Sequence, residues 1–248
     1  MQTGTAMRIG TAGWSIPDDA KAAFPAMPSQ LEGYASVLGA VEVNSSFHRP
    51  HRISTYQRWA AAVPDGFRFA VKVPKTITHE SRLSGVEPLI DGFLAEVAGL
   101  EGKLGPLLVQ LPPSLTFQVE IAECFLRHMR DRVAGPVACE PRHATWFEPE
   151  AEALLVAFRI GRVAADPALV PQAGRPGGWQ GLSYCRLHGA PRIYHSAYAD
   201  TVIRDTLTRL SAHARNGSEC WCMFDNTASG AATQNALTAM TMLADIVA

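Results

Sequence analysis

Short runs of β-branched and aromatic residues recur along the whole chain, and segments with a helical repeat of apolar positions lie between them. The runs are separated by a few tens of residues, which is too far for hairpins and suits strand–helix–strand crossovers. We therefore predict eight strands, at residues 7–12, 40–44, 67–73, 107–111, 137–141, 162–166, 182–188 and 220–225.

Several of the intervening segments carry helix start and stop signals. Ser29 and Glu32 form a capping box before an apolar repeat that ends at Gly39, and Pro88 stands at the first turn of a second helix. Further helices are predicted at 149–161, 200–216 and 231–246. The segment 167–181 is rich in Pro and Gly and cannot sustain a helix, so we expect an extended loop after the sixth strand.

Eight strands with interleaved helices in 248 residues match the size of a (β/α)₈ barrel. No linker or shift in composition divides the chain. The predicted fold class is therefore α/β, a TIM-type (β/α)₈ barrel in which a loop replaces the helix after the sixth strand. Residues 1–6 are expected to form a poorly ordered tail, and residues 7–248 a single domain.

Alternation along each strand predicts which side chains point into the barrel. In 67–73 the odd positions are bulky and apolar and should face the helices, so Lys72 points inward at the C-terminal end. Burying a polar group without a partner costs about 1–3 kcal/mol, so the inward polar groups must pair with one another, with water or with a ligand. The same alternation turns inward Glu42, Asn44, Gln110, Glu140, Arg142, Asp166, Arg186 and His188.

Composition narrows the class of protein. The chain is 47% hydrophobic and 18% charged with a net charge of −1, which gives no uniform field for gripping nucleic acid or an anionic membrane. No apolar run reaches the roughly 18 residues that a membrane-spanning helix needs. The first residues lack the pattern of a signal peptide, so we expect a cytoplasmic protein.

Glu140 is the first candidate for a catalytic carboxylate, because it ends a strand beside Arg142 and His143. The alternative is a structural ion pair with Arg186 or Lys72. His143 and His188 are further candidates for proton transfer.

Cationic side chains should form a rim at the same end, where they could hold a carboxylate or a phosphate. Nearby carboxylates could instead neutralise this rim, so the ligand need not carry a high charge. The segment that begins at Asn226 enters the last helix through small residues, which could hold an anion or serve close packing. The substrate-binding candidates are Trp14, Asn44, Lys72, His79, Gln110, Arg142, Arg186, Asp225 and Asn226.

Seven segments in order resemble the domain-of-unknown-function family 72, also called the YecE-like family: 9–14, 41–47, 67–72, 104–114, 140–146, 184–189 and 224–227. The resemblance runs from residue 9 to the last helix and implies a TIM-barrel-like fold. It implies no particular reaction. His48 stands where the family usually has Tyr, and Asp225 stands where it usually has Asn.

These patterns favour an enzyme of the hydrolase or isomerase/lyase type that acts on a small polar or anionic substrate at the C-terminal face of the barrel. The alternative is a non-catalytic protein that binds nucleic acid or a sugar-like ligand, although the charge balance makes nucleic acid the less favoured partner. No cofactor is predicted. Strand-end carboxylates could hold a divalent metal, but adjacent Lys and Arg side chains would repel it. The oligomeric state is not predicted.

Overall fold

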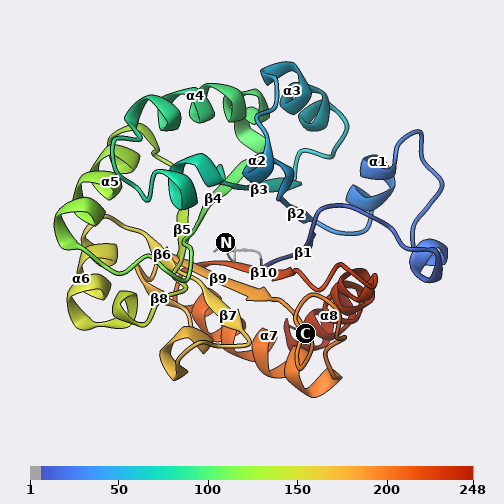
Figure 1. The fold of residues 1–248 in the computed structure, drawn as a ribbon. Coiled ribbons are helices and arrows are strands. Elements are labelled where there is room, and N and C mark those ends of the chain that lie inside the picture. The colour runs from blue at the N-terminus through green and yellow to red at the C-terminus, as the bar shows by residue number, and fades with distance from the viewer. Residues whose placement is uncertain (1–6, 248) are drawn as a thin grey trace.

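The computed structural model describes residues 7–247, and the predicted tail at residues 1–6 lies outside the described residues. The strands form one ring with helices outside it (Figure 1). Hydrogen bonding places them in the order β7-β9-β10-β1-β2-β3-β4-β5-β6-β8. Their bounds are β1 Arg8–Ala12, β2 Ala40–Val43, β3 Arg68–Lys72, β4 Leu104–Gln110, β5 Val137–Glu140, β6 Gly161–Arg162, β7 Ala164–Asp166, β8 Gly177–Gly178, β9 Leu182–Leu187 and β10 Glu219–Phe224.

The sixth barrel position is one strand in two halves. β6 pairs in parallel with β5, and β7 pairs in parallel with β9, so this broken strand completes the ring. The two-residue β8 pairs antiparallel to β6 outside the eightfold pattern. Between Asp166 and β9 the chain forms only a 3₁₀ turn, Pro171–Gly174, and β8. The predicted TIM-type barrel, with a loop in place of the sixth helix, is confirmed.

The α-helices are α1 Gln30–Ala35, α2 Ser45–His48, α3 Ile53–Ala61, α4 Glu87–Val97, α5 Val119–Arg132, α6 Pro149–Ala157, α7 Asp200–Arg215 and α8 Ala231–Val247. Short 3₁₀ segments follow α4 and β5, at Ala98–Lys103 and Ala144–Phe147, and a π-helical turn spans Thr76–Glu80. The Ser29 hydroxyl accepts from the backbone N–H of Glu32, as the capping box requires. The sequence signals did not identify α2, α3 or α5, which lack a side chain that caps the first turn.

Two apolar layers support the barrel. The larger lies between the strands and the helices, and the smaller fills the inside of the barrel. Tyr184 stacks on Trp221 inside, with ring centroids 5.9 Å apart. The polar residues at the C-terminal strand ends therefore lie directly above the inner apolar layer. Barrel enzymes have their active sites at this end of the barrel. The inner layer consists of Ala40, Ala70, Leu108, Ala138, Val163, Leu182, Tyr184, Trp221 and Met223, with Trp179 packed against it.

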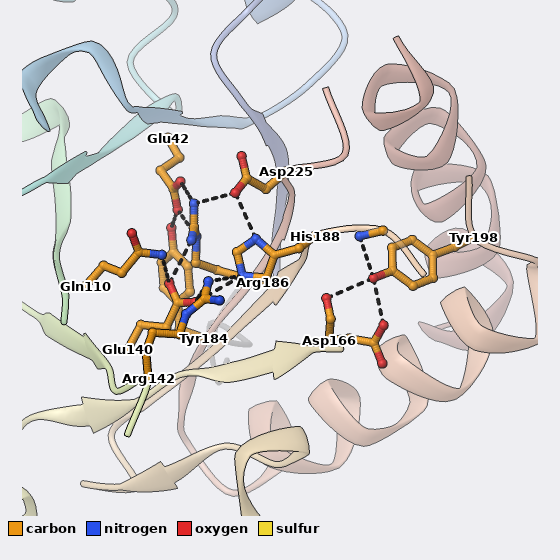
Figure 2. A network of polar contacts seen from close by, with 11 residues as sticks. Glu42, Gln110, Glu140, Arg142, Asp166, Tyr184, Arg186, His188, Tyr198 and Asp225 are labelled. Carbon is orange, nitrogen blue, oxygen red and sulfur yellow. Dashed lines mark hydrogen bonds and ion pairs between the residues drawn. The ribbon is translucent and has the colours of Figure 1, made fainter. Parts of the chain in front are cut away.

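The prediction for the sixth strand was wrong by one residue. Val163 packs inside the barrel, and Ala164 belongs to the outer layer. Asp166 therefore does not join the inward polar residues; its carboxylate accepts a hydrogen bond from the Tyr198 hydroxyl at 2.7 Å. Figure 2 shows this pair apart from the main polar network. Alternation failed here because the strand is broken at Val163 into two short pieces with different partners.

Candidate functional site

Arg186 is the centre of a buried ionic network at the C-terminal ends of the strands (Figure 2). It lies on β9, points inward and is fully buried. Its Nε and Nη2 donate to both oxygens of Glu42, at 3.0 and 2.6 Å. Its Nη1 donates to Glu140 at 2.7 Å, and its Nη2 also donates to Asp225 at 3.0 Å. One guanidinium thus joins three carboxylates from β2, from the end of β5 and from the segment after β10.

Further donors hold the same carboxylates. The Tyr184 hydroxyl donates to Glu42 at 2.7 Å, and Gln110 Nε2 donates to Glu140 at 3.1 Å. Arg142 forms an ion pair with Glu140. Glu140 is therefore held by at least three side chains and is buried, which is a fully paired arrangement for an interior carboxylate.

His188 bridges two of these carboxylates. Its Nδ1 lies 2.8 Å from Asp225 Oδ2, and its Nε2 lies 3.0 Å from Glu140 Oε1. Arg142 Nη2 is also 2.9 Å from Nε2. A doubly protonated ring would donate to both carboxylates, whereas a ring protonated only at Nδ1 would accept from Arg142. The site can thus hold His188 in either protonation state.

The network keeps the carboxylates of Glu140 and Asp225 ionised. Burial alone would raise the pKa of Glu140, but Arg186, then His188 and Arg142, outweigh it and place that pKa well below its usual value. The pKa of Asp225 is lowered in the same way, because Arg186 and His188 together outweigh its burial. Conversely, the three carboxylates outweigh the burial of Arg186 and raise its pKa. These groups carry fixed charges at neutral pH.

Lys72 differs from its charged neighbours. It ends β3 and points inward, and only 8% of its surface is exposed. Its Nζ lies 4.0 Å from the centroid of the Phe47 ring, and within residues 7–247 it has no hydrogen bond or ion pair. Burial, followed by the charge of Arg186, lowers the pKa of Lys72 to about 8, although three carboxylates act in the opposite direction. His79 packs against the same Phe47 ring, with centroids 4.9 Å apart.

Sequence reasoning placed Lys72, Gln110, Glu140, Arg142, Arg186, His188 and Asp225 at one end of the barrel, and the structure brings them together. Asn44 follows β2 with its Oδ1 buried and without a hydrogen-bond partner among the described residues. Glu42 and Tyr184 were not among the predicted site residues, although alternation along its strand turned Glu42 inward. Phe47 was not among the predicted site residues either.

Other predicted site residues have local structural contacts. The Nδ1 of His143 accepts from the backbone N–H of Thr145 and caps the turn that follows β5. Asn226 donates to Asn235 Oδ1 and to the Ser196 carbonyl, which ties the end of β10 to α8. Trp14 packs edge-on against Trp59, with ring centroids 5.0 Å apart. None of these three has a recorded contact with the Arg186 network among the described residues.

Within residues 7–247, no group of three or more His, Cys, Asp or Glu side chains is arranged to hold a metal ion. Arg186 stands between the carboxylates where a cation would bind them. The prediction that no cofactor is used is not tested by this arrangement. In the same part of the chain, no helix is long and apolar enough to cross a membrane.

Comparison with known proteins gives relatives whose names state no reaction. The chain is 31% identical to the UPF0759 protein YecE of Escherichia coli (strain K12) over 141 residues, which is 56% of this chain and 49% of that protein. It is 27% identical to the UPF0759 protein YunF of Bacillus subtilis (strain 168) over 148 residues, 57% of this chain and 52% of that protein. These alignments span about half the length of each relative.

Solved structures share the fold over nearly the whole chain. A DUF72 family protein from Enterococcus faecalis V583 superimposes with a TM-score of 0.78 at 25% identity, covering 97% of this chain and 98% of that one. A DUF72 family protein from Thermotoga maritima MSB8 gives a TM-score of 0.79 at 23% identity, covering 96% and 100%. Residues 8–247 match the family described as protein of unknown function DUF72, and the chain belongs to that family.

Proposed function

We propose that this protein is an enzyme of the isomerase or lyase type that acts on a small polar or anionic substrate at the C-terminal mouth of the barrel. The amine of Lys72 is the reactive group, and the Arg186 network surrounds it with fixed charges. The observation that carries the proposal is that Lys72 is buried and has no hydrogen bond or ion pair within residues 7–247, while the three carboxylates whose charges act on it are already held by Arg186.

Lys72 suits proton transfer better than Glu140 does. A group that exchanges protons works best when its pKa is near the working pH, and the pKa of Lys72 is about 8. The pKa of Glu140 lies well below its usual value, so this carboxylate is a weak base at neutral pH. In this proposal Glu140 positions Arg142 and His188 rather than taking a proton from the substrate.

The charges at the mouth indicate which substrates fit. The carboxylates of Glu42, Glu140 and Asp225 balance the cations of Arg186, Arg142 and Lys72 when His188 is neutral. A substrate with many negative charges would gain little from a balanced site. We therefore favour hydroxyl-bearing compounds with at most one or two negative charges.

A second candidate function is a non-catalytic protein that binds a sugar-like ligand. It is favoured by the saturation of the network, since Nε, Nη1 and Nη2 of Arg186 each already donate to a carboxylate. In that case the network is a structural plug, and only the less buried parts of the rim, such as the half-buried Arg142, would contact the ligand.

A ligand screen with matched variants tests the proposal. The full chain, K72M and K75M are screened at pH 7 by thermal shift against polyols, hydroxy acids and sugar monophosphates, and each stabilising compound is then assayed for conversion. Lys75 is the control because it lies three residues after Lys72, is only half-buried and pairs with Glu80. A compound present at a hundred times its dissociation constant adds about 2.7 kcal/mol of stability.

We expect stabilisation and conversion by the unmodified chain and by K75M, and at least a hundredfold slower conversion by K72M, in line with loss of an acid–base group. Ligands that stabilise all three proteins equally and are never converted would overturn the enzymatic proposal and support the binding protein.

A further inference from the structure

We infer that Lys72 is a nucleophilic amine that forms an imine with the aldehyde or ketone group of its substrate, so that the site takes small carbonyl compounds. This inference rests on the proposed function and deepens it, because it names the substrate class and a covalent role for the same amine.

The first support is the contrast between Lys72 and the other lysines. The chain has four lysines, and the other three form ion pairs with carboxylates at the surface: Lys21 with Asp18, Lys75 with Glu80 and Lys103 with Asp65. Lys72 is buried at the end of a barrel strand, and its Nζ faces the Phe47 ring. An ion-paired ammonium is a poor nucleophile because its lone pair carries a proton, whereas a buried amine without an ion-pair partner gives up that proton more readily.

The surroundings of Lys72 favour the neutral amine. Burial removes water from it, and Arg186 places a fixed positive charge close by; together these bring its pKa to about 8. At pH 8 about half of the Lys72 side chains are then neutral, against roughly one in a hundred or fewer for an ordinary lysine. Burial and the neighbouring charge of Lys72 also lower the pKa of His79. His79 packs against the same Phe47 ring that Lys72 contacts, so it is placed to exchange protons with the bound substrate.

The chemistry balances without any further reagent. The Lys72 lone pair forms a C–N bond to the carbonyl carbon, and a proton moves from that nitrogen to the carbonyl oxygen to give a neutral carbinolamine. The new hydroxyl takes a second proton from solvent and leaves as water when its C–O bond breaks, and the nitrogen keeps one hydrogen, which gives a positively charged iminium. The negative charges of Glu42, Glu140 and Asp225 act on this amine and favour its positively charged form, so they stabilise the iminium. The iminium draws electrons from the adjacent carbon and acidifies its C–H bond, as isomerase or lyase chemistry requires.

Reductive trapping tests the inference. The full chain at pH 8 is mixed separately with glycolaldehyde, glyceraldehyde, dihydroxyacetone and pyruvate, and sodium cyanoborohydride reduces any iminium to a stable secondary amine. Intact mass spectrometry counts the adducts, and peptide mapping assigns them among four lysines and the terminal amine. K72R keeps the positive charge but has no amine that reacts in this way, and K75M is the control. Circular dichroism establishes that each variant is folded.

We expect at least one of these compounds to label Lys72 at least tenfold faster than Lys21, Lys75 or Lys103. The label should be absent from that peptide in K72R and unchanged in K75M. Because the four lysines compete within one unmodified chain, the mapping gives an answer even if K72R fails to fold. Labelling of Lys72 at or below the rate of the surface lysines with every compound would overturn the inference.

That failure is distinguishable from failure of the proposed function. If Lys72 is not trapped but the ligand screen still finds compounds that are converted by the unmodified chain and by K75M and not by K72M, the imine is wrong and a proton-transfer role for Lys72 stands. If neither trapping nor Lys72-dependent conversion is seen, both proposals fail.

Discussion

The buried amine of Lys72 lowers the stability of the folded protein, and strand β3 does not need a charged side chain at this position in order to form. The pKa of its amine falls from the usual 10.5 to about 8, because of burial first and of Arg186 second. That change amounts to about 3 kcal/mol against the charged form in the folded state. An apolar side chain of similar length would fill the space without this cost. Charged residues that lower stability are common where a protein needs them for activity.

The K72M variant is therefore expected to be more stable than the unmodified chain at pH 7, by up to about 3 kcal/mol in urea unfolding. Below pH 8 the amine is charged in both states, so the cost is complete. Between pH 8 and 10.5 the unfolded chain binds more protons, so the stability of the unmodified chain rises with pH and the advantage of K72M shrinks. A less stable K72M at pH 7 would contradict the assigned cost. K75M should show no such pH-dependent gap.

Arg186 is expected to be the most sensitive charged position. R186M leaves three buried carboxylates without their common partner, and breaking a buried pair in this way costs about 3–5 kcal/mol. Protonation of the carboxylates relieves the repulsion, so the loss measured by urea unfolding should be smaller at pH 4 than at pH 7. The control is R127M, which removes an exposed pair with Glu123 on α5 and should change stability little. Equal effects of the two variants would show that the network adds no stability.

At the scale of elements, the strands depend on close approach inside the barrel. Gly105 lies on β4, and a Cβ atom added at this position would be 2.7 Å from Cη2 of Trp221 on β10. Trp221 is fully buried and stacks under Tyr184, so it has little room to move. A glycine is thus required by packing across the barrel, which the pattern along β4 alone does not reveal.

G105A is expected to destabilise the protein by about 1–3 kcal/mol through overpacking, measured by urea unfolding. G102A is the matched control, because a Cβ atom there has no neighbour within 4 Å. The double variant G105A/W221F should recover part of the loss relative to W221F alone, since the clash involves the six-membered ring of the indole. A loss that is the same with and without W221F would place the cause elsewhere.

At the scale of the whole molecule, the Arg186 network ties the barrel together. Its carboxylates come from β2, the end of β5 and the segment after β10, and the guanidinium comes from β9. The Tyr198 hydroxyl, which donates to Asp166 and accepts from Gly189 N–H, joins the loop after β9 to β7 separately. Titration of the network should therefore affect the stability of the complete fold.

Stability is expected to fall in acid, below about pH 4.5. The folded-state pKa values of Glu140 and Asp225 are lowered from the usual 4.5 and 3.8, so their contribution is complete above these values and is lost as pH falls through the lower folded ones. D225N removes one such group, and its stability gap to the unmodified chain should narrow as pH falls from 7 to 3. Urea midpoints measure this gap, with D205N on the exposed face of α7 as the control. A constant gap across this range would contradict the lowered pKa of Asp225.

Patterns along the chain predicted the parts that depend on neighbours in sequence. Period-two alternation placed Lys72, Glu140 and Arg186 inside the barrel because successive side chains of a regular strand take opposite faces. The Pro- and Gly-rich segment 167–181 predicted the missing helix for an equally local reason. α5 was missed because neither a typical capping residue nor a proline stands at its start, and its stability comes from packing of its apolar face.

The sequence by itself thus determined the barrel, its strand positions and most of the polar groups at its mouth, since period, caps and breakers act within a few residues. Only the tertiary structure decided how those groups pair. The break at Val163 turned Asp166 toward Tyr198, and His143 turned away to cap a turn. Arg186 forms ion pairs with all three carboxylates, and the Lys72 amine contacts the Phe47 ring. Such pairings depend on distances across the barrel between residues far apart in the chain, and no local pattern encodes those distances.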